Sequence, residues 1–164
     1  MSRLEDFTEI HPIDVVETLA THHEWQFERL ADDQIAMVIE GQWRSYSVTL
    51  AWSDYDKVLR MICTFDMEPP QDALPALYEV LNLVNEKCWA GAFGYWSEQK
   101  LMVYRYGLIL AGEQLASEDQ IARMIDTAVL ASEHYYPAFQ LAVWEGFGPQ
   151  EALETVIAES YGHA

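Results

Sequence analysis

The sequence predicts an α/β fold of the α+β type, in which an antiparallel sheet of about five to six strands has helices packed on one face. Between residues 25 and 67, short segments of alternating apolar and polar residues follow one another with brief polar turns between them. That pattern is typical of an antiparallel meander. Helical periodicity occurs before this region, after it and again near the C-terminus. The chain has 164 residues, 51% of them hydrophobic, which suits a single domain over residues 1–164.

The first helix is expected at about residues 12–22, because Pro12 suits a first helical turn and apolar residues recur at Ile13, Val16 and Leu19. Strands are then expected at residues 25–30, 35–40, 45–52 and 58–67. The third of these has the clearest period of two. Its large apolar residues, on one face, are Tyr46, Val48, Leu50 and Trp52.

Two adjacent prolines within residues 68–75 end this run of strands, because proline cannot continue a ladder of hydrogen bonds. A helix with apolar residues three and four positions apart follows. Its apolar stripe consists of Leu74, Leu77, Leu81, Val84 and Cys88. Asp72 or a neighbour is expected to cap this helix, and Pro75 is expected in its first turn.

A second stripe on the same helix contains Tyr78, Asn82, Asn85 and Trp89, about 100° round from the apolar one. Two interpretations remain open. The asparagines either bond to the backbone of the sheet or a loop, as a structural joint, or line a ligand pocket between the sheet and the helix. Catalysis by asparagine needs a nucleophile and a base nearby, and this stretch supplies neither, so the joint is favoured. Gly91 is expected to give the left-handed or tight backbone at which the helix changes to a strand.

Two further strands are expected at residues 92–97 and 101–110. Arg105, within the second strand, is expected to face solvent or an acidic residue, and a salt bridge is favoured because 27 acidic residues are available. Ser117 and Gln120 then have the spacing of a capping box for another helix.

Pro137 is expected to kink that helix or to begin a second piece over residues 138–145. Gly146 and Gly148 end the helix, and Pro149 opens a last short one. Residues 146–164 are therefore predicted to form a C-terminal helical extension.

The formal net charge of −18, from 9 basic and 27 acidic residues, excludes several kinds of partner. Such a surface repels nucleic acids and anionic membranes, and the Lys and Arg residues are scattered singly along the sequence. After Arg123 there are acidic residues but no Lys or Arg. This last segment is either a core-packing helix with a solvated acidic face or an acidic, aromatic docking surface. The charge favours basic or amphipathic protein partners.

The chain is expected to be cytoplasmic. Its N-terminus has no apolar region typical of a signal peptide, and no run approaches the roughly 18 apolar residues that span a bilayer. The two cysteines, Cys63 and Cys88, lie in apolar runs and are expected to be buried free thiols.

The sequence contains none of the glycine-rich phosphate loops, zinc or calcium spacings or nucleophile elbows that mark common active sites. The adjacent His22 and His23 would point about 100° apart on a helix and cannot easily share one metal ion. We therefore predict a protein that is not an enzyme, with no catalytic residues, cofactor or metal. Four large aromatic residues are instead the candidates for contact with a partner, with ordinary core packing as the alternative for each. They are Trp43, Trp52, Trp144 and Phe147.

The chain resembles the YbjN family of bacterial sensory transduction regulators over about residues 12–145. The resemblance depends on a Leu-Asn-x-x-Asn stretch followed by Gly-x-Phe, on a strand with an arginine and on a proline in the next helix. These residues are Leu81, Asn82, Asn85, Gly91, Phe93, Arg105 and Pro137. The resemblance implies a fold similar to that of type III secretion chaperones, with protein–protein contacts, often in homodimers, and no established catalytic residues.

The leading hypothesis is therefore a non-catalytic regulatory or chaperone-like module that binds a protein segment by helix docking or strand addition. The alternative is a small-molecule sensor whose pocket is lined by the Tyr78, Asn82, Asn85 and Trp89 stripe.

Overall fold

The computed structural model describes residues 10–112 and 115–162. Its centre is one six-stranded sheet in which all neighbouring strands are antiparallel, in the order β1-β2-β3-β4-β6-β5. The strands are β1 (Gln26–Ala31), β2 (Gln34–Glu40), β3 (Ser45–Ser53), β4 (Val58–Asp66), β5 (Ala92–Trp96) and β6 (Leu101–Ile109). The helices are α2 (Pro12–His22), the 3-10 helix η1 (Gln71–Ala73), α3 (Leu74–Asn85), α4 (Glu118–Val143) and α5 (Pro149–Gly162).

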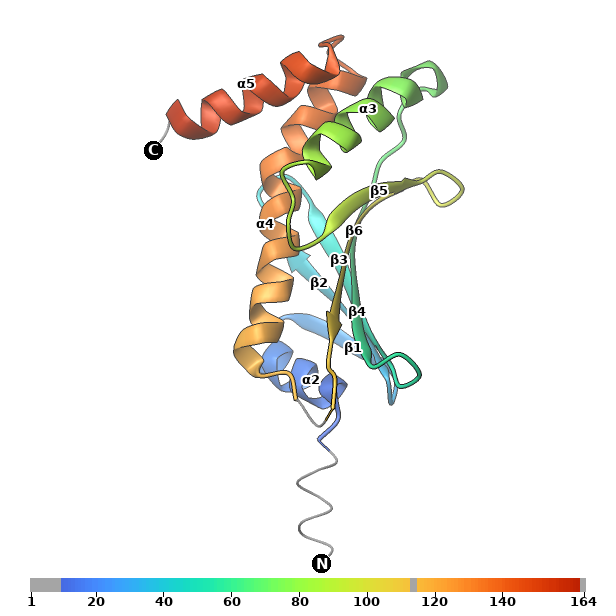
Figure 1. Ribbon diagram of the computed structural model, residues 1–164, viewed down its shortest axis with the longest axis vertical. Coiled ribbons are helices and arrows are strands. Elements are labelled where there is room, and N and C mark those ends of the chain that lie inside the picture. The colour runs from blue at the N-terminus through green and yellow to red at the C-terminus, as the bar shows by residue number, and fades with distance from the viewer. Residues whose placement is uncertain (1–9, 113–114, 163–164) are drawn as a thin grey trace, which may run out of the picture.

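The helices cover one face of the sheet (Figure 1). Helix α2 packs on β1, β2 and β3, while the long helix α4 crosses β4 and β6 and α3 contacts β5. Helix α5 packs on α3 and α4 instead of on the sheet. The predicted α+β class, with a sheet of five to six antiparallel strands and helices on one face, is confirmed.

The register of the strands explains why the apolar residues alternate. Met37, Val48, Cys63, Tyr104 and Phe93 lie side by side across five strands. All five are buried beneath the helices. Because successive residues of a strand point to opposite faces, the residues between them lie on the other face, which is not covered by any helix of residues 10–112 and 115–162 (Figure 1).

Aromatic rings join α4 to the sheet. The Phe93 ring of β5 meets the rings of Tyr104 and Phe139 edge to face, with centroids 4.9 and 5.4 Å apart. Further along α4, the Tyr136 ring makes the same kind of contact with Phe65 of β4, at 5.6 Å. Such pairs stabilise a core beyond the burial of their area, and they fix the position of α4 on the sheet.

Of the two outcomes expected at Pro137, a kink or a second helical piece, the second is wrong. Helix α4 continues through Pro137 to Val143. Proline removes one backbone hydrogen bond, but Tyr136, Ala138 and Phe139 beside it are all buried in the core. Tertiary packing of these neighbours outweighs the local cost of the proline. The predicted capping box at Ser117 and Gln120 is present.

Helix α3 differs from its prediction at both ends. No side chain caps its start, where η1 leads directly into the helix, although Pro75 does lie in the first turn. The helix ends at Asn85, so that Cys88 and Trp89 lie beyond it. Gly91 has no positive φ. It is needed because a Cβ there would lie 2.6 Å from the Tyr104 hydroxyl and 2.7 Å from the Arg105 carbonyl oxygen.

The two cysteines are free, with Cys63 buried and Cys88 only partly buried. Burial raises the pKa of Cys63 from 9.0 to about 12. At pH 8 we expect Cys88 to react with a thiol reagent in the folded protein, and Cys63 to react only after unfolding in urea. Between pH 9 and 12 the unfolded Cys63 loses its proton while the folded one keeps it, so its contribution to stability declines as the pH rises through that range.

A Cys88→Ser variant is the control for this experiment, since its remaining thiol should be unreactive until urea is added. Rapid labelling of folded Cys88→Ser protein at pH 8 would show that Cys63 is accessible and contradict the packing described.

Candidate functional site

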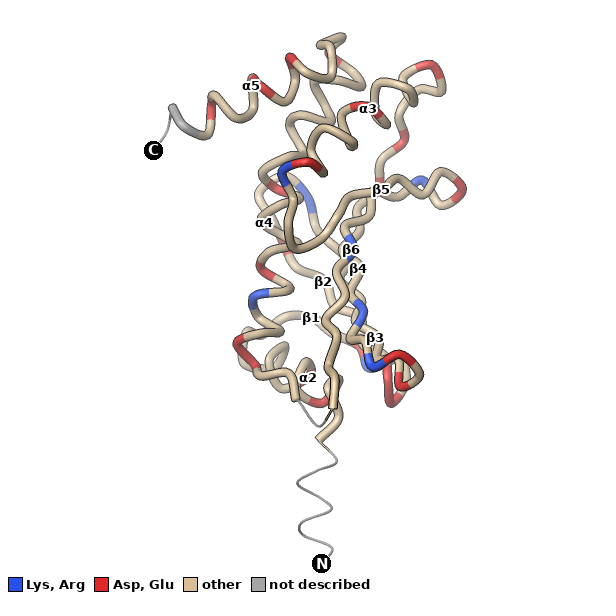
Figure 2. Tube along the Cα trace, in the orientation of Figure 1, with Lys and Arg blue, Asp and Glu red and all other residues tan. Residues whose placement is uncertain are grey.

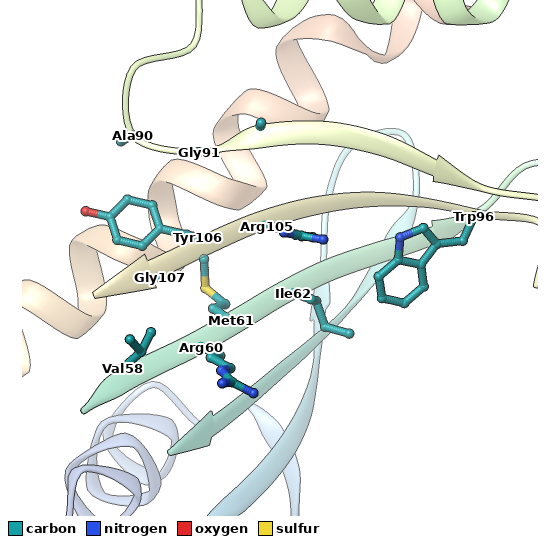
Figure 3. Close-up of a pocket in the computed structure, with 11 residues that line it drawn as sticks. Val58, Arg60, Met61, Ile62, Ala90, Gly91, Trp96, Arg105, Tyr106 and Gly107 are labelled. Carbon is teal, nitrogen blue, oxygen red and sulfur yellow. The ribbon is translucent and has the colours of Figure 1, made fainter. Parts of the chain in front are cut away.

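The face of the sheet opposite the helices is hollowed over β4, β6 and the start of β5. Figure 3 shows the residues that line this hollow. Its volume is about 630 Å³. The described residues that line it include no cysteine, histidine, serine or carboxylate. Small residues create the space, since Ala92 and Gly107 contribute almost no side chain to this part of the sheet. Trp96 bounds the hollow, with its ring lying near Ile62 (Figure 3).

Two arginines give this hollow a positive character in a strongly acidic protein. Arg60 of β4 and Arg105 of β6 both line it, and basic residues stand out along these strands in Figure 2. Arg60 is partly engaged, with its guanidinium 2.9 Å from Asp56. In the part of the chain that the structure describes, the side chain of Arg105 makes no ion pair or hydrogen bond. Arg105 therefore faces solvent, and the salt bridge that the sequence favoured does not form among the described residues. Its guanidinium is free to bind an anionic group.

The four aromatic residues predicted as partner contacts lie in three separate places. Trp43 is in the turn between β2 and β3, where it is 50% exposed and its backbone N–H lies 3.3 Å from a Glu133 carboxylate oxygen. Trp52 is near the other end of β3, roughly 30 Å away along the strand, and is partly buried against the core. These two tryptophans cannot belong to one small contact surface.

Trp144 and Phe147 lie in the link between α4 and α5. Trp144 is 46% exposed, whereas Phe147 is partly buried against the core. Within this group, Trp43 and Trp144 have the exposed ring area that a partner could cover.

The predicted ligand stripe is also dispersed. Tyr78 and Asn82 are exposed on α3, and Trp89, beyond the end of the helix, is 97% exposed. Asn85 alone turns toward the sheet. Its side-chain oxygen accepts a hydrogen bond from the Phe93 N–H at 2.8 Å, and its side-chain nitrogen donates to the Phe93 carbonyl oxygen at 3.0 Å.

This pair of bonds makes Asn85 act like a neighbouring peptide group for β5. An amide side chain carries one donor group and one acceptor, the same pair that a backbone presents. The geometry gives Asn85 the structural role at the helix–sheet joint that the sequence favoured.

Sequence reasoning missed the residues of the hollow as a group. The alternation along β6 could have placed Arg105 on the face opposite Tyr104 and Tyr106. It could not show that Gly107 lies beside Arg60, and Arg105 beside Ile62. That pairing depends on β6 inserting between β4 and β5, an order that does not follow the sequence.

In the described residues, no three His, Cys, Asp or Glu side chains gather in a way that could hold a metal ion. The helices of the described ranges are also too short or too polar to cross a membrane.

A family model described as "Putative bacterial sensory transduction regulator", named YbjN, matches residues 12–141. The chain belongs to the YbjN family. The match includes the whole sheet and nearly all of α4, while α5 lies outside it. No curated protein sequence matches the chain.

Among solved structures, the chain is similar to one described as "Crystal structure of YbjN, a putative transcription regulator from E. coli". The TM-score is 0.50 at 12% sequence identity, and the alignment covers 92% of each chain. At this identity the likeness is one of fold, and it agrees with the family match.

Proposed function

We propose that this YbjN-family protein is a non-catalytic regulatory module that binds a partner protein on the open face of its sheet. The observation that carries the proposal is the hollow over β4, β6 and β5, which combines a tryptophan, two arginines and small residues. Tryptophan and arginine are the residue types most enriched at the energetic centres of protein interfaces. The family's description as a regulator agrees with this proposal.

The chemistry of the lining supports binding rather than catalysis. Nucleophilic and acid–base catalysis most often use Ser, Cys, His, Asp or Glu near the reacting atoms. Among the described residues none of these lines the hollow, and Tyr106 is the one lining residue with a hydroxyl. The role is thus proposed to be recognition, by one domain over residues 1–164 acting in the cytoplasm.

Charge is proposed to select the partner. The long-range field of a −18 chain favours a partner with a basic surface. At the hollow itself, the unpaired Arg105 favours an acidic group on that partner. The net negative charge and Arg105 together would give specificity. A uniformly acidic protein is repelled by the net charge, and a uniformly basic protein is repelled by Arg105 at the centre of the contact.

Capture of a partner from lysate of the source organism, at moderate salt, tests the proposal. We expect Arg105→Glu to reduce the captured partner at least tenfold, because it replaces an attractive contact with a repulsive one. Lys100→Glu makes the same change of charge in the turn before β6 and should have little effect.

A Trp144→Ala variant distinguishes binding at the open face from binding at the acidic C-terminal segment. A partner that is lost with Trp144→Ala and retained with Arg105→Glu would contradict binding at the open face. Melting temperatures of all three variants show whether any loss of capture comes from unfolding.

A further inference from the structure

β6 is longer than the strand outside it. β6 has nine residues, but β5 pairs only with Leu101 to Arg105. Before Ala92 the chain leaves the sheet toward α3 (Figure 1). The outer edge of β6 from Tyr106 to Ile109 therefore carries no strand in the part that the structure describes.

Two hydrogen bonds show which backbone groups face this edge. The Leu110 N–H donates to the Lys57 carbonyl oxygen at 2.8 Å, and the Lys100 carbonyl oxygen accepts from the Met67 N–H at 3.1 Å. Even-numbered residues here thus direct their backbone groups toward the β4 side. Because the direction alternates along an antiparallel strand, Gly107 and Ile109 direct their N–H and C=O groups outward. Both residues are exposed, Ile109 by 69%.

The neighbouring edge is treated differently. On β5, the outward backbone groups of Phe93 are covered by the side chain of Asn85. Proteins usually cover or interrupt the edges of their sheets, since open edges pair with other chains. On β6, by contrast, no hydrogen bond from the described residues covers the outward backbone groups of Gly107 and Ile109.

Hollows lie on both sides of this open edge. The 630 Å³ hollow with Arg105 and Gly107 is on the open face. A second hollow of about 260 Å³ lies between β6 and the start of α4, lined by Tyr106 and Leu108 among others. Its polar lining residues are Asp119, Gln120, Arg123 and Thr127. Ala90, in the loop before β5, lines both hollows, so that they meet at the edge.

We propose that the outer edge of β6 binds an extended segment of a partner protein as an added β-strand, and that this segment alternates apolar and acidic residues. The inference rests on the proposed function, binding of a partner protein, and adds to it the binding mode and the kind of segment that is bound. The free edge is four residues long, roughly 13 Å, which sets the length of the pairing. Backbone hydrogen bonds supply affinity in this mode, and alternate side chains supply specificity.

The alternation follows from the two sides of the edge. A partner residue opposite Gly107 projects onto the open face, where glycine leaves room and Arg105 is the next residue on the same face. An acidic side chain fits there. Partner residues opposite Tyr106 and Leu108 project into the second hollow, against the side chains of those two residues, and are therefore apolar.

A second copy of the chain fits this edge less well. Its own free edge, Tyr106 to Ile109, contains no acidic residue that could lie beside Arg105. Charge complementarity therefore selects an acidic segment of a different protein.

Selection from a phage-displayed library of random twelve-residue linear peptides, with the full chain as bait, tests the proposal. We expect the selected peptides to share an apolar–acidic–apolar core. Their affinities, measured with synthetic peptides, should fall at least tenfold in both Ile109→Pro and Arg105→Glu. Proline at position 109 removes an outward N–H and leaves the bonds to β4 in place. Lys100→Glu is the charge-matched control and should bind normally.

N-methylated peptides give a second measurement that needs no variant of the protein. A strand added to an edge uses the N–H groups of alternate residues only. Methylating one alternate set should abolish binding, and methylating the other set should leave it within about threefold. Equal effects of the two sets would overturn strand addition, even if Ile109→Pro fails to fold.

The remaining outcomes separate this inference from the proposed function. Selected peptides that bind Ile109→Pro and Arg105→Glu as well as the original chain would overturn the inference and leave protein binding in place. Light scattering gives the mass of the protein in solution. A mass of twice 18.9 kDa for the original protein, falling to the monomer mass in Ile109→Pro, would assign the edge to a second copy and would also overturn the inference. Failure to select any peptide, while the lysate experiment still captures a partner through Arg105, would overturn only the strand-addition mode.

Discussion

Replacing Phe139 by alanine is expected to lower the free energy of unfolding by about 3–5 kcal/mol. Phe139 is completely buried, and its ring meets the Phe93 ring at 5.4 Å. Truncation removes apolar burial, leaves a cavity and breaks an aromatic pair that joins α4 to β5. Urea denaturation followed by circular dichroism measures the change.

Leu130→Ala on the same helix is the matched control. Leu130 is 66% exposed, so we expect a change within about 0.5 kcal/mol. A loss below about 1 kcal/mol for Phe139→Ala would show that α4 does not pack on β5 as described.

Replacing Asn85 by alanine is expected to lower the free energy of unfolding by about 2–6 kcal/mol. The change removes two hydrogen bonds and leaves the N–H and C=O of the buried Phe93 without partners, at roughly 1–3 kcal/mol for each unsatisfied group. We expect the replacement to lower the stability of the whole fold and also to expose the backbone of β5, because these two bonds cover the edge of that strand. Urea denaturation gives the global cost, and hydrogen exchange of the Phe93 amide gives the local one.

Asn82→Ala, one helical turn earlier, is the control. Asn82 is exposed, and we expect its replacement to be nearly neutral for stability. Equal costs at both positions would contradict the structural assignment of Asn85. A metabolite that raises the melting temperature of the original protein but not of Asn85→Ala or Asn82→Ala would instead support the small-molecule sensor hypothesis.

The sequence predicted the elements of the fold better than their connections in space. The alternation along 45–52 and the spacing of Leu74, Leu77 and Leu81 are local signals, because each depends on one burial face of one element. The end of α3 at Asn85 was not visible in its apolar stripe. It follows from the contact of Asn85 with Phe93, a tertiary interaction. The continuation of α4 through Pro137 also has a tertiary cause, the burial of its neighbours Tyr136, Ala138 and Phe139 in the core.

The candidate site was less predictable for a related reason. Arg60, Gly107 and Trp96 are ordinary strand residues in the sequence, and only the insertion of β6 between β4 and β5 brings them to one hollow. The aromatic residues that the sequence favours as partner contacts are spread over the turn between β2 and β3, the end of β3 and the α4–α5 link. Sequence spacing indicates which face a residue occupies, but the order of strands decides which residues share that face.

Hydrogen exchange of backbone amides, measured by NMR on the chain alone and in complex with its captured partner, tests the central claim most directly. If the partner binds at the open face and the free edge of β6, the amides of Gly107 and Ile109 should exchange at least tenfold more slowly in the complex. Unchanged exchange at both amides, with new protection confined to α5, would contradict binding at this edge and move the binding surface to the acidic C-terminal part of the protein.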